Sequence, residues 1–505
     1  MNNLSIFESP NEGEVTLCEV DGKIYSTDYK LGNVSAYTNT LDNHPKILIT
    51  GDMLHHYRKG DEAGSLFLPV EEPLLKRLIQ VYSNNGITEF FNVIKESGPI
   101  IIRSLAAVAL TIANGLELLQ CKFTPRTMEN HLTLLSNLAQ TRLWLQSSIR
   151  CIAWHDYQTK IAIATSDDVV RIYSSNSKVV PILKCKQQRN IMCLAWRPLS
   201  NTEIAIGCET GIIVWNVDDT SLITRPSINN ATILQRSSHA PVVSLAWSRE
   251  GDTLASAAAH DSVILMWNVE MNESSSLKES SGHGNCLLKW SPTGNKLLSA
   301  TTTLIFRVWE CQTWKPERWN VLTGRIQACC WSPCGSVILF VTNTEPIIYA
   351  LSFMQSEMVF ANNLQNTPNQ AIPVYDLSKG DIDDVVVGGI VINMEWDQKN
   401  NYVAILFRDT NYVAIFRICI RPVIKLTPCC LVSGAPEEKP MCISFQGNFQ
   451  FGTCLSIGWS SGRVQHFPIV FSEIDGSVGN LQNQFGNTSI YNSFSKYSPT
   501  TSFLS

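Results

Sequence analysis

Short apolar runs that end in an aromatic residue recur along the chain from residue 148 onward. Successive aromatic ends lie 42, 51, 43, 41, 65 and 49 residues apart, and four of these six intervals match the roughly 40–45 residues of a four-stranded propeller blade. The pattern predicts seven blades, with insertions in the two longest intervals. We call the aromatic ends the blade anchors, and they are Trp154, Trp196, Trp247, Trp290, Trp331, Trp396 and Phe445.

Two further apolar runs follow each anchor, as EIAIG and IIVWNV follow Trp196. These runs are rich in Val, Ile and aromatic residues, and polar or glycine turns separate them, which is typical of β-strands. The WSP-x-G turns that begin at Trp290 and Trp331 place Pro and Gly where a tight turn requires them. With one outer strand in each unit, residues 146–471 are predicted to form an all-β, seven-bladed propeller.

The segment before the propeller, residues 1–145, changes from strand to helix periodicity. Residues 14–20, EVTLCEV, alternate between apolar and polar positions, and we predict that they pair with the last blade near RVQHFPIVF to close the ring. Between residues 72 and 145, Leu74, Leu75, Leu78 and Ile79 begin a series of helical segments. Their leucines are expected to pack on the propeller or on a partner.

Two stretches interrupt or follow the repeats. Residues 353–390 form the longest insertion, and IPVYDLS within it is predicted to be an outer strand. Residues 472–505 are rich in Ser, Asn and Gln, so this tail is predicted to be disordered.

Composition narrows the function classes. The net charge of −5 and the absence of a long Lys/Arg run argue against direct nucleic-acid binding. Many of the 16 cysteines lie inside apolar runs, which indicates buried thiols in a reducing compartment. The closest zinc-like spacing, Cys330 to Cys334, has no second pair, so we expect no metal site and no cofactor.

Residues 98–119 hold an uncharged core of 13 residues, which is shorter than a membrane-spanning helix. We expect a buried or partner-facing helix here, and a helix on a membrane surface is the weaker alternative.

The sequence contains no motif of an enzyme active site. G-x-S-x-G, H-E-x-x-H, P-loop and G-x-G-x-x-G patterns are all missing. The acidic pairs Asp167-Asp168, Asp218-Asp219 and Asp383-Asp384 are typical of solvated loops, and His260-Asp261 is better explained as structure than as a catalytic dyad. We expect a non-enzymatic interaction scaffold, because a propeller is a rigid disc with two faces of loops.

The repeats resemble the WD40 family. The Trp-Asp dipeptide of that family has changed to Trp215-Asn216, Trp267-Asn268 and Trp309-Glu310, and the Gly-His element remains at Gly282-His283. The resemblance implies a hydrogen-bonded structural tetrad in each blade, and one unit keeps all of its members. That tetrad is His239, Ser256, Asp261 and Trp267.

A more specific resemblance covers almost the whole chain. The strings GEVTLCE, QRNIMCLAWRPLS, HAPVVSLAWSREGDTLASAA, FRVWE and LSIGWSSGRVQHFPIVF, in this order, resemble the Aladin family of WD-repeat nucleoporins. This resemblance implies a scaffold of the nuclear pore complex at the nuclear envelope, held there by a transmembrane nucleoporin and supporting protein and mRNA transport between nucleus and cytoplasm. It also implies a link to the mitotic spindle or centrosomal region.

Two other functions remain open from the sequence. One is a WD40 adaptor of another complex, either a substrate receptor of a ubiquitin ligase or a coat subunit. The more remote one is a propeller hydrolase, since propeller enzymes gather their catalytic residues from several blades. In each alternative the fold is the same, so the discrimination depends on partners and activity.

Overall fold

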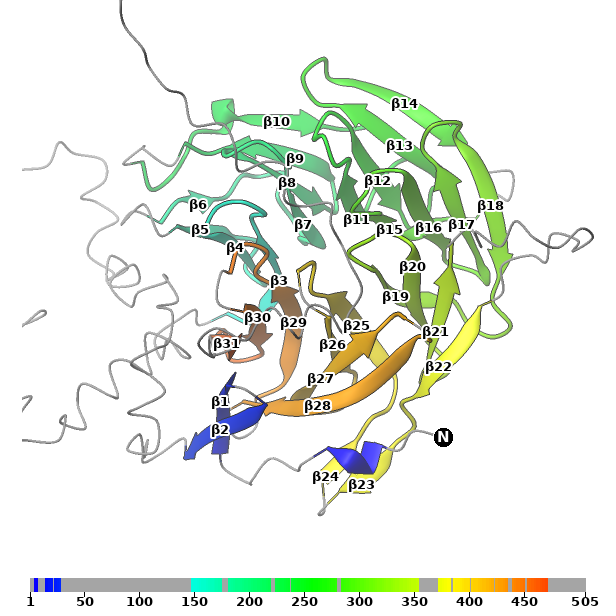
Figure 1. Cartoon of the computed structure of the whole chain (residues 1–505). Coiled ribbons are helices and arrows are strands. Elements are labelled where there is room, and N and C mark those ends of the chain that lie inside the picture. Colours follow the sequence, from blue (N-terminus) through cyan, green and yellow to red (C-terminus); the bar gives the residue numbers. More distant parts are fainter. Residues whose placement is uncertain are drawn as a thin grey trace, which may run out of the picture.

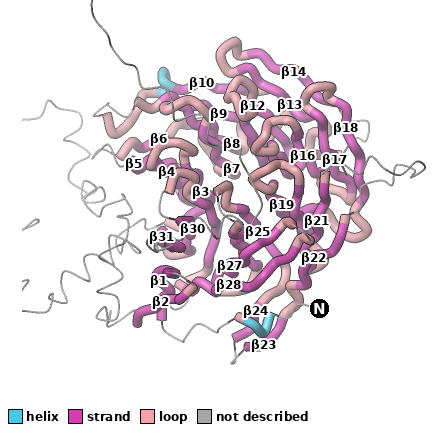
Figure 2. Tube along the Cα trace, viewed as in Figure 1, coloured by secondary structure: helices cyan, strands magenta, loops and turns pink. Residues whose placement is uncertain are grey.

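The structure is a computed structural model, and it confirms a seven-bladed β-propeller built almost entirely from strands (Figures 1 and 2). Within the residues that the structure describes, no helix has the length and apolar character that a bilayer crossing requires. The described residues are 4–7, 14–20, 22–28, 147–174, 180–218, 223–236, 238–278, 283–353, 371–382, 385–399, 401–421, 423–434, 438–449 and 452–470. The helical segments expected in residues 72–145, the apolar stretch 98–119 and the tail 472–505 lie outside them.

The first three blades each contain four antiparallel strands, with the innermost strand first in the chain. Blade one consists of β3 (Ile149–Trp154), β4 (Lys160–Thr165), β5 (Val170–Ser174) and β6 (Ile182–Leu183). Blade two consists of β7 (Cys193–Trp196), β8 (Glu203–Cys208), β9 (Gly211–Asn216) and β10 (Ala231–Leu234), with the 3-10 turn η4 (Ile228–Asn230) before β10. Blade three consists of β11 (Val242–Trp247), β12 (Leu254–Ala258), β13 (Val263–Asn268) and β14 (Glu273–Lys278).

The next three blades repeat this order. Blade four consists of β15 (Asn285–Trp290), β16 (Lys296–Thr301), β17 (Ile305–Glu310) and β18 (Lys315–Asn320). Blade five consists of β19 (Ile326–Trp331), β20 (Val337–Thr342), β21 (Ile347–Ser352) and β22 (Ile372–Asp376), so IPVYDLS does supply an outer strand. A hairpin of β23 (Gly380–Ile382) and β24 (Val385–Val387) follows, still within the expected insertion. Blade six consists of β25 (Val391–Trp396), β26 (Tyr402–Phe407), β27 (Tyr412–Cys419) and β28 (Lys425–Ser433).

Blade seven combines both ends of the described chain. Its C-terminal strands are β29 (Pro440–Phe445), β30 (Gly452–Trp459) and β31 (Val464–Val470). The N-terminal strand β1 (Glu14–Val20) lies beside β31 and parallel to it, with Glu19 opposite Ile469, and β2 (Lys23–Asp28) forms the outer edge. The innermost strand β29 also contacts β3, which closes the ring (Figure 1).

The core is divided among the interfaces between blades. Each strand turns alternate side chains to its two faces, and both faces of a blade meet a neighbouring blade. Strands such as β4 and β20 are therefore buried at every position. One apolar cluster lies between each pair of adjacent blades in the described part of the chain, including blades seven and one. The turn η1 (Leu4–Ile6) and Phe7 add to the cluster between blades five and six.

Candidate functional site

The four residues of the expected tetrad lie together in blade three. The His239 Nδ1 atom is 2.8 Å from Asp261 Oδ2, and its Nε2 atom is 2.8 Å from Ser256 Oγ. The Trp267 indole Nε1 donates to the same Ser256 oxygen at 2.8 Å. Ser256 lies on β12 and Trp267 on the neighbouring β13, whereas His239 precedes β11 and Asp261 follows β12.

These three hydrogen bonds fix which atom donates and which accepts in each contact. Because Ser256 Oγ accepts from the indole, its own proton points to His239 Nε2, and Nδ1–H then donates to the Asp261 carboxylate. Burial lowers the pKa of His239, although Asp261 opposes this effect, so the imidazole is neutral in this arrangement. The tetrad satisfies polar groups that would otherwise be unpaired in an apolar core.

A serine, a histidine and an aspartate in this order also describe a catalytic triad. Access excludes that role here, because Ser256 is 0% exposed and its oxygen already accepts a hydrogen bond from Trp267. The dyad considered from the sequence does not form either. Asp261 is bound to His239, and its neighbour His260 is exposed.

Blade two solves the same problem with a residue that the sequence analysis missed. Gln188 precedes its anchor, Trp196, by the same spacing that separates His239 from Trp247. Its Oε1 accepts from Trp215 Nε1 at 3.2 Å, and its Nε2 donates to the backbone oxygens of Asp168 and Leu183. The spacing was the available signal for this role.

Blade four shows why the Gly-His element alone is a poor guide. His283 is one residue closer to its anchor than His239 is, and its side chain is exposed. The indole of Trp309 donates to Ser299 Oγ at 3.0 Å, so this blade keeps the serine–tryptophan pair. Neighbouring residues of an extended segment point to opposite sides, so a shift of one residue directs the His283 side chain away from the blade core.

Each blade anchor is the last residue of an innermost strand. Trp196 donates to the backbone oxygen of Ala153, and Trp247 to that of Ala195, at 3.0 and 3.2 Å. In both cases the acceptor is the residue just before the anchor of the preceding blade, and Trp331 bonds Lys289 in the same way at 3.0 Å. These three anchors therefore fasten blades two, three and five to the blade before them. Trp290 instead bonds Gly294 in its own turn, and Trp396 Nε1 has no partner within the described residues.

The anchor of blade one bonds blade seven across the ring closure, but through a side chain and not a backbone oxygen. Trp154 Nε1 donates to Ser456 Oγ of blade seven at 2.8 Å, and Ser456 lies 2.8 Å from His466 Nδ1. Burial lowers the pKa of His466 to about 4, which keeps its imidazole neutral near pH 7. First and last blades are thus joined by a buried polar chain.

The N-terminal strand forms a second bond network at this closure. Thr16 Oγ1 accepts from the Ser433 amide of blade six at 3.1 Å, and Ser433 Oγ donates to the Glu14 backbone oxygen at 3.1 Å. On the blade-seven side, Gln465 Nε2 donates to the Thr16 backbone oxygen. Strand β1 therefore bridges blades six and seven.

The non-repeating string RPLS after Trp196 forms a clamp between blades. Arg197 binds Glu203 in its own blade at 2.6 Å, and it binds the Gly251 backbone oxygen and Glu270 in blade three at 2.6 and 2.9 Å. From blade one, His155 lies 2.9 Å from the Ser200 backbone oxygen. These residues hold neighbouring blades together.

A hollow of about 530 Å³ lies on blade two. Polar side chains including Glu203, Asn216 and Thr232 line it together with Ile223, which is 57% exposed. The other chemical candidates give no site in the described residues. Asp167 and Asp168 are loop residues, and Cys330 is buried while Cys334 is exposed.

The propeller of this chain is similar to those of known proteins. A family model of the Aladin seven-bladed propeller matches residues 130–470. The Aladin protein of Arabidopsis thaliana is 24% identical over 348 residues, which cover 63% of this chain and 75% of that protein. Two solved structures cover 64% of this chain at a TM-score of 0.47. They are the β-propeller domain of Myceliophteria thermophila Cps50 (Swd1), 16% identical and covered to 98%, and a chain of the mitotic checkpoint complex, 13% identical and covered to 92%. Since the family model spans more than half of the sequence, the chain belongs to the Aladin family of seven-bladed propellers.

Proposed function

We propose that this chain is a non-enzymatic scaffold of the nuclear pore complex, held at the nuclear envelope by a transmembrane nucleoporin. The match to the Aladin propeller over residues 130–470 carries the proposal. In this role the chain supports transport between nucleus and cytoplasm, and the same family resemblance extends the proposal to the mitotic spindle or centrosomal region.

The chemistry of blade three supports a scaffold over an enzyme. The one triad-like arrangement found in the described residues is a buried structural tetrad, with Ser256 shielded from any substrate. The polar chains between blades make the disc rigid, and rigidity keeps several binding surfaces in a fixed relation to one another. The partners we propose are other nucleoporins, above all a pore-membrane protein. The chain itself does not contact nucleic acid directly, and its membrane association is indirect.

Proximity labelling with the full chain as bait in intact cells tests the choice of complex. We expect enrichment of pore-membrane proteins and other nucleoporins, with an unfused labelling enzyme as the control. Enrichment of ubiquitin-ligase or vesicle-coat subunits without nucleoporins would contradict the proposal and favour an adaptor of another complex.

A further inference from the structure

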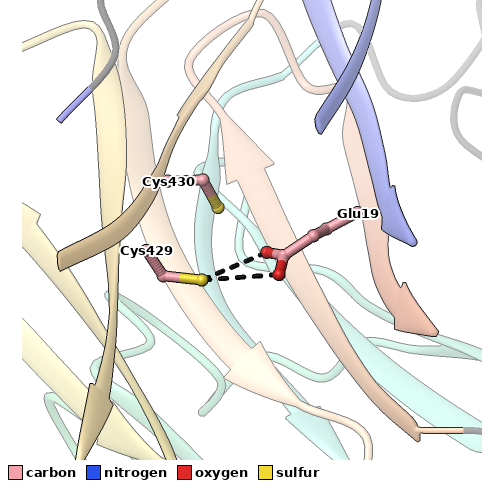
Figure 3. A group of neighbouring side chains, drawn as sticks. All are labelled: Glu19, Cys429 and Cys430. Carbon is pink, nitrogen blue, oxygen red and sulfur yellow. Dashed lines mark hydrogen bonds between the residues drawn. The ribbon is translucent and has the colours of Figure 1, made fainter. Parts of the chain in front are cut away.

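Three potential metal ligands meet where the N-terminal strand crosses blade six (Figure 3). Glu19 lies on β1, and Cys429 and Cys430 lie on β28. The Cys429 thiol donates to both carboxylate oxygens of Glu19, at Sγ–Oε1 3.5 Å and Sγ–Oε2 3.2 Å. The ligand atoms of all three residues lie within 4.8 Å of one another.

A β-bulge places the two adjacent thiols on the same side. Neighbouring residues of a regular strand point to opposite faces, so Cys429 and Cys430 would normally diverge. On β28, however, Cys430 pairs with Ile415 and Pro428 with Phe416, which leaves Cys429 as the extra residue of the bulge. A bulge changes the direction in which a side chain points. Here it turns the Cys429 side chain to the side on which Cys430 and Glu19 lie.

The charge balance of the cluster favours a cation. Glu19 is 3% exposed, and no lysine or arginine of the described residues forms an ion pair with it. A buried carboxylate without a cationic partner is costly, so such groups are normally hydrogen-bonded, paired with a positive charge or bound to a metal. A divalent cation here would neutralise the Glu19 carboxylate and would bind both thiols as thiolates.

We propose that Glu19, Cys429 and Cys430 bind one zinc ion, with water as the fourth ligand. Two thiolates and a carboxylate suit Zn²⁺ better than Mg²⁺ or Ca²⁺, which prefer oxygen. Zn–S and Zn–O bonds of about 2.3 and 2.0 Å at a tetrahedral angle separate S and O by about 3.5 Å, close to the present Sγ–Oε distances. Binding releases the two thiol protons to solvent, and the partly exposed Cys429 leaves a route for the ion.

This proposal departs from the expectation of no metal site. The spacing of cysteines in the sequence gave no indication, because Glu19 is 410 residues away from Cys429 along the chain. The ion would cross-link β1 to blade six and so fasten the N-terminal strand that completes the ring. A zinc site of this kind goes beyond the proposed scaffold role and does not depend on it.

Zinc and cobalt binding to the reduced, full-length protein test the proposal. We expect one tightly bound Zn²⁺ per chain and, after Co²⁺ replacement, a thiolate-to-cobalt charge-transfer band in the near ultraviolet. Cys430→Ser and Cys429→Ser each leave one thiolate, so both should weaken this band, and both should weaken zinc binding more than about 100-fold, since loss of a side chain that only orients a ligand costs about 10–100-fold. The matched control, Cys334→Ser, removes an exposed thiol elsewhere and should keep both properties.

Two further measurements distinguish the loss of a zinc ligand from the misfolding of a variant. Chelation of the metal from the unmutated chain should lower its melting temperature, and added Zn²⁺ should restore it. Cys429→His, which keeps a zinc ligand, should retain binding with a shifted cobalt spectrum. Absence of stoichiometric zinc in the unmutated reduced chain, or zinc binding that survives in a folded Cys429→Ser/Cys430→Ser double variant, would overturn the proposal.

Discussion

Deletion of residues 1–22 is expected to lower the melting temperature of the propeller by on the order of 10 °C. The deletion removes β1, which covers β31 and bridges blades six and seven through Thr16. It also removes the buried side chains of Leu4, Phe7, Val15 and Leu17. Each buried apolar side chain contributes about 1.5–3 kcal/mol, and about 1 kcal/mol shifts the melting temperature of a large domain by about 2–4 °C. Differential scanning calorimetry of the full and truncated chains measures the change.

A pair of point variants checks that the effect comes from packing. Phe7 is 3% exposed and meets the Phe416 ring edge-on at 5.2 Å between centroids, whereas Ile6 beside it is 65% exposed. Phe7→Ala should therefore destabilise the propeller by about 3–5 kcal/mol, and Ile6→Ala should change little. Equal melting temperatures for the truncated and full chains would show that β1 is not part of the ring.

Ser256→Ala is expected to reduce the free energy of unfolding by about 2–5 kcal/mol. The serine oxygen is the shared partner of His239 Nε2 and Trp267 Nε1, and its loss leaves two polar atoms unpaired in the core. Each unsatisfied buried group costs about 1–3 kcal/mol. Chemical denaturation followed by tryptophan fluorescence provides the measurement.

Ser275→Ala is the matched control for this substitution. Ser275 lies in the same blade, on the outer strand β14, and its side chain is exposed. We expect a change within about 0.5 kcal/mol there. If the two serine variants had the same stability, the tetrad would contribute nothing to the fold.

Much of the fold could be predicted because the repeat is local. The alternation of apolar residues, the anchors at strand ends and the WSP-x-G turns are all written within a few residues, and Gly294 and Gly335 do have the positive φ that those turns need. The outer strand of blade five, β22, was also predicted in its place. The tetrad could be named from the sequence because blade three keeps all four members of the family pattern.

Contacts between blades could not be predicted in the same way. The residues Gln188 and Arg197 lie outside the repeating pattern, and only the structure shows that Gln188 replaces a tetrad member and that Arg197 bonds blade two to blade three. Trp154 and Ser456, or Glu19 and Cys429, are hundreds of residues apart, and no local periodicity links them. The bulge at Cys429 adds a residue that breaks the strand period on which sequence reasoning depends.

The localisation of a full-length fluorescent fusion in living cells tests the central claim most directly. A scaffold of the nuclear pore complex should give a smooth rim around the interphase nucleus. A diffuse cytosolic signal from an intact, folded fusion would contradict the account.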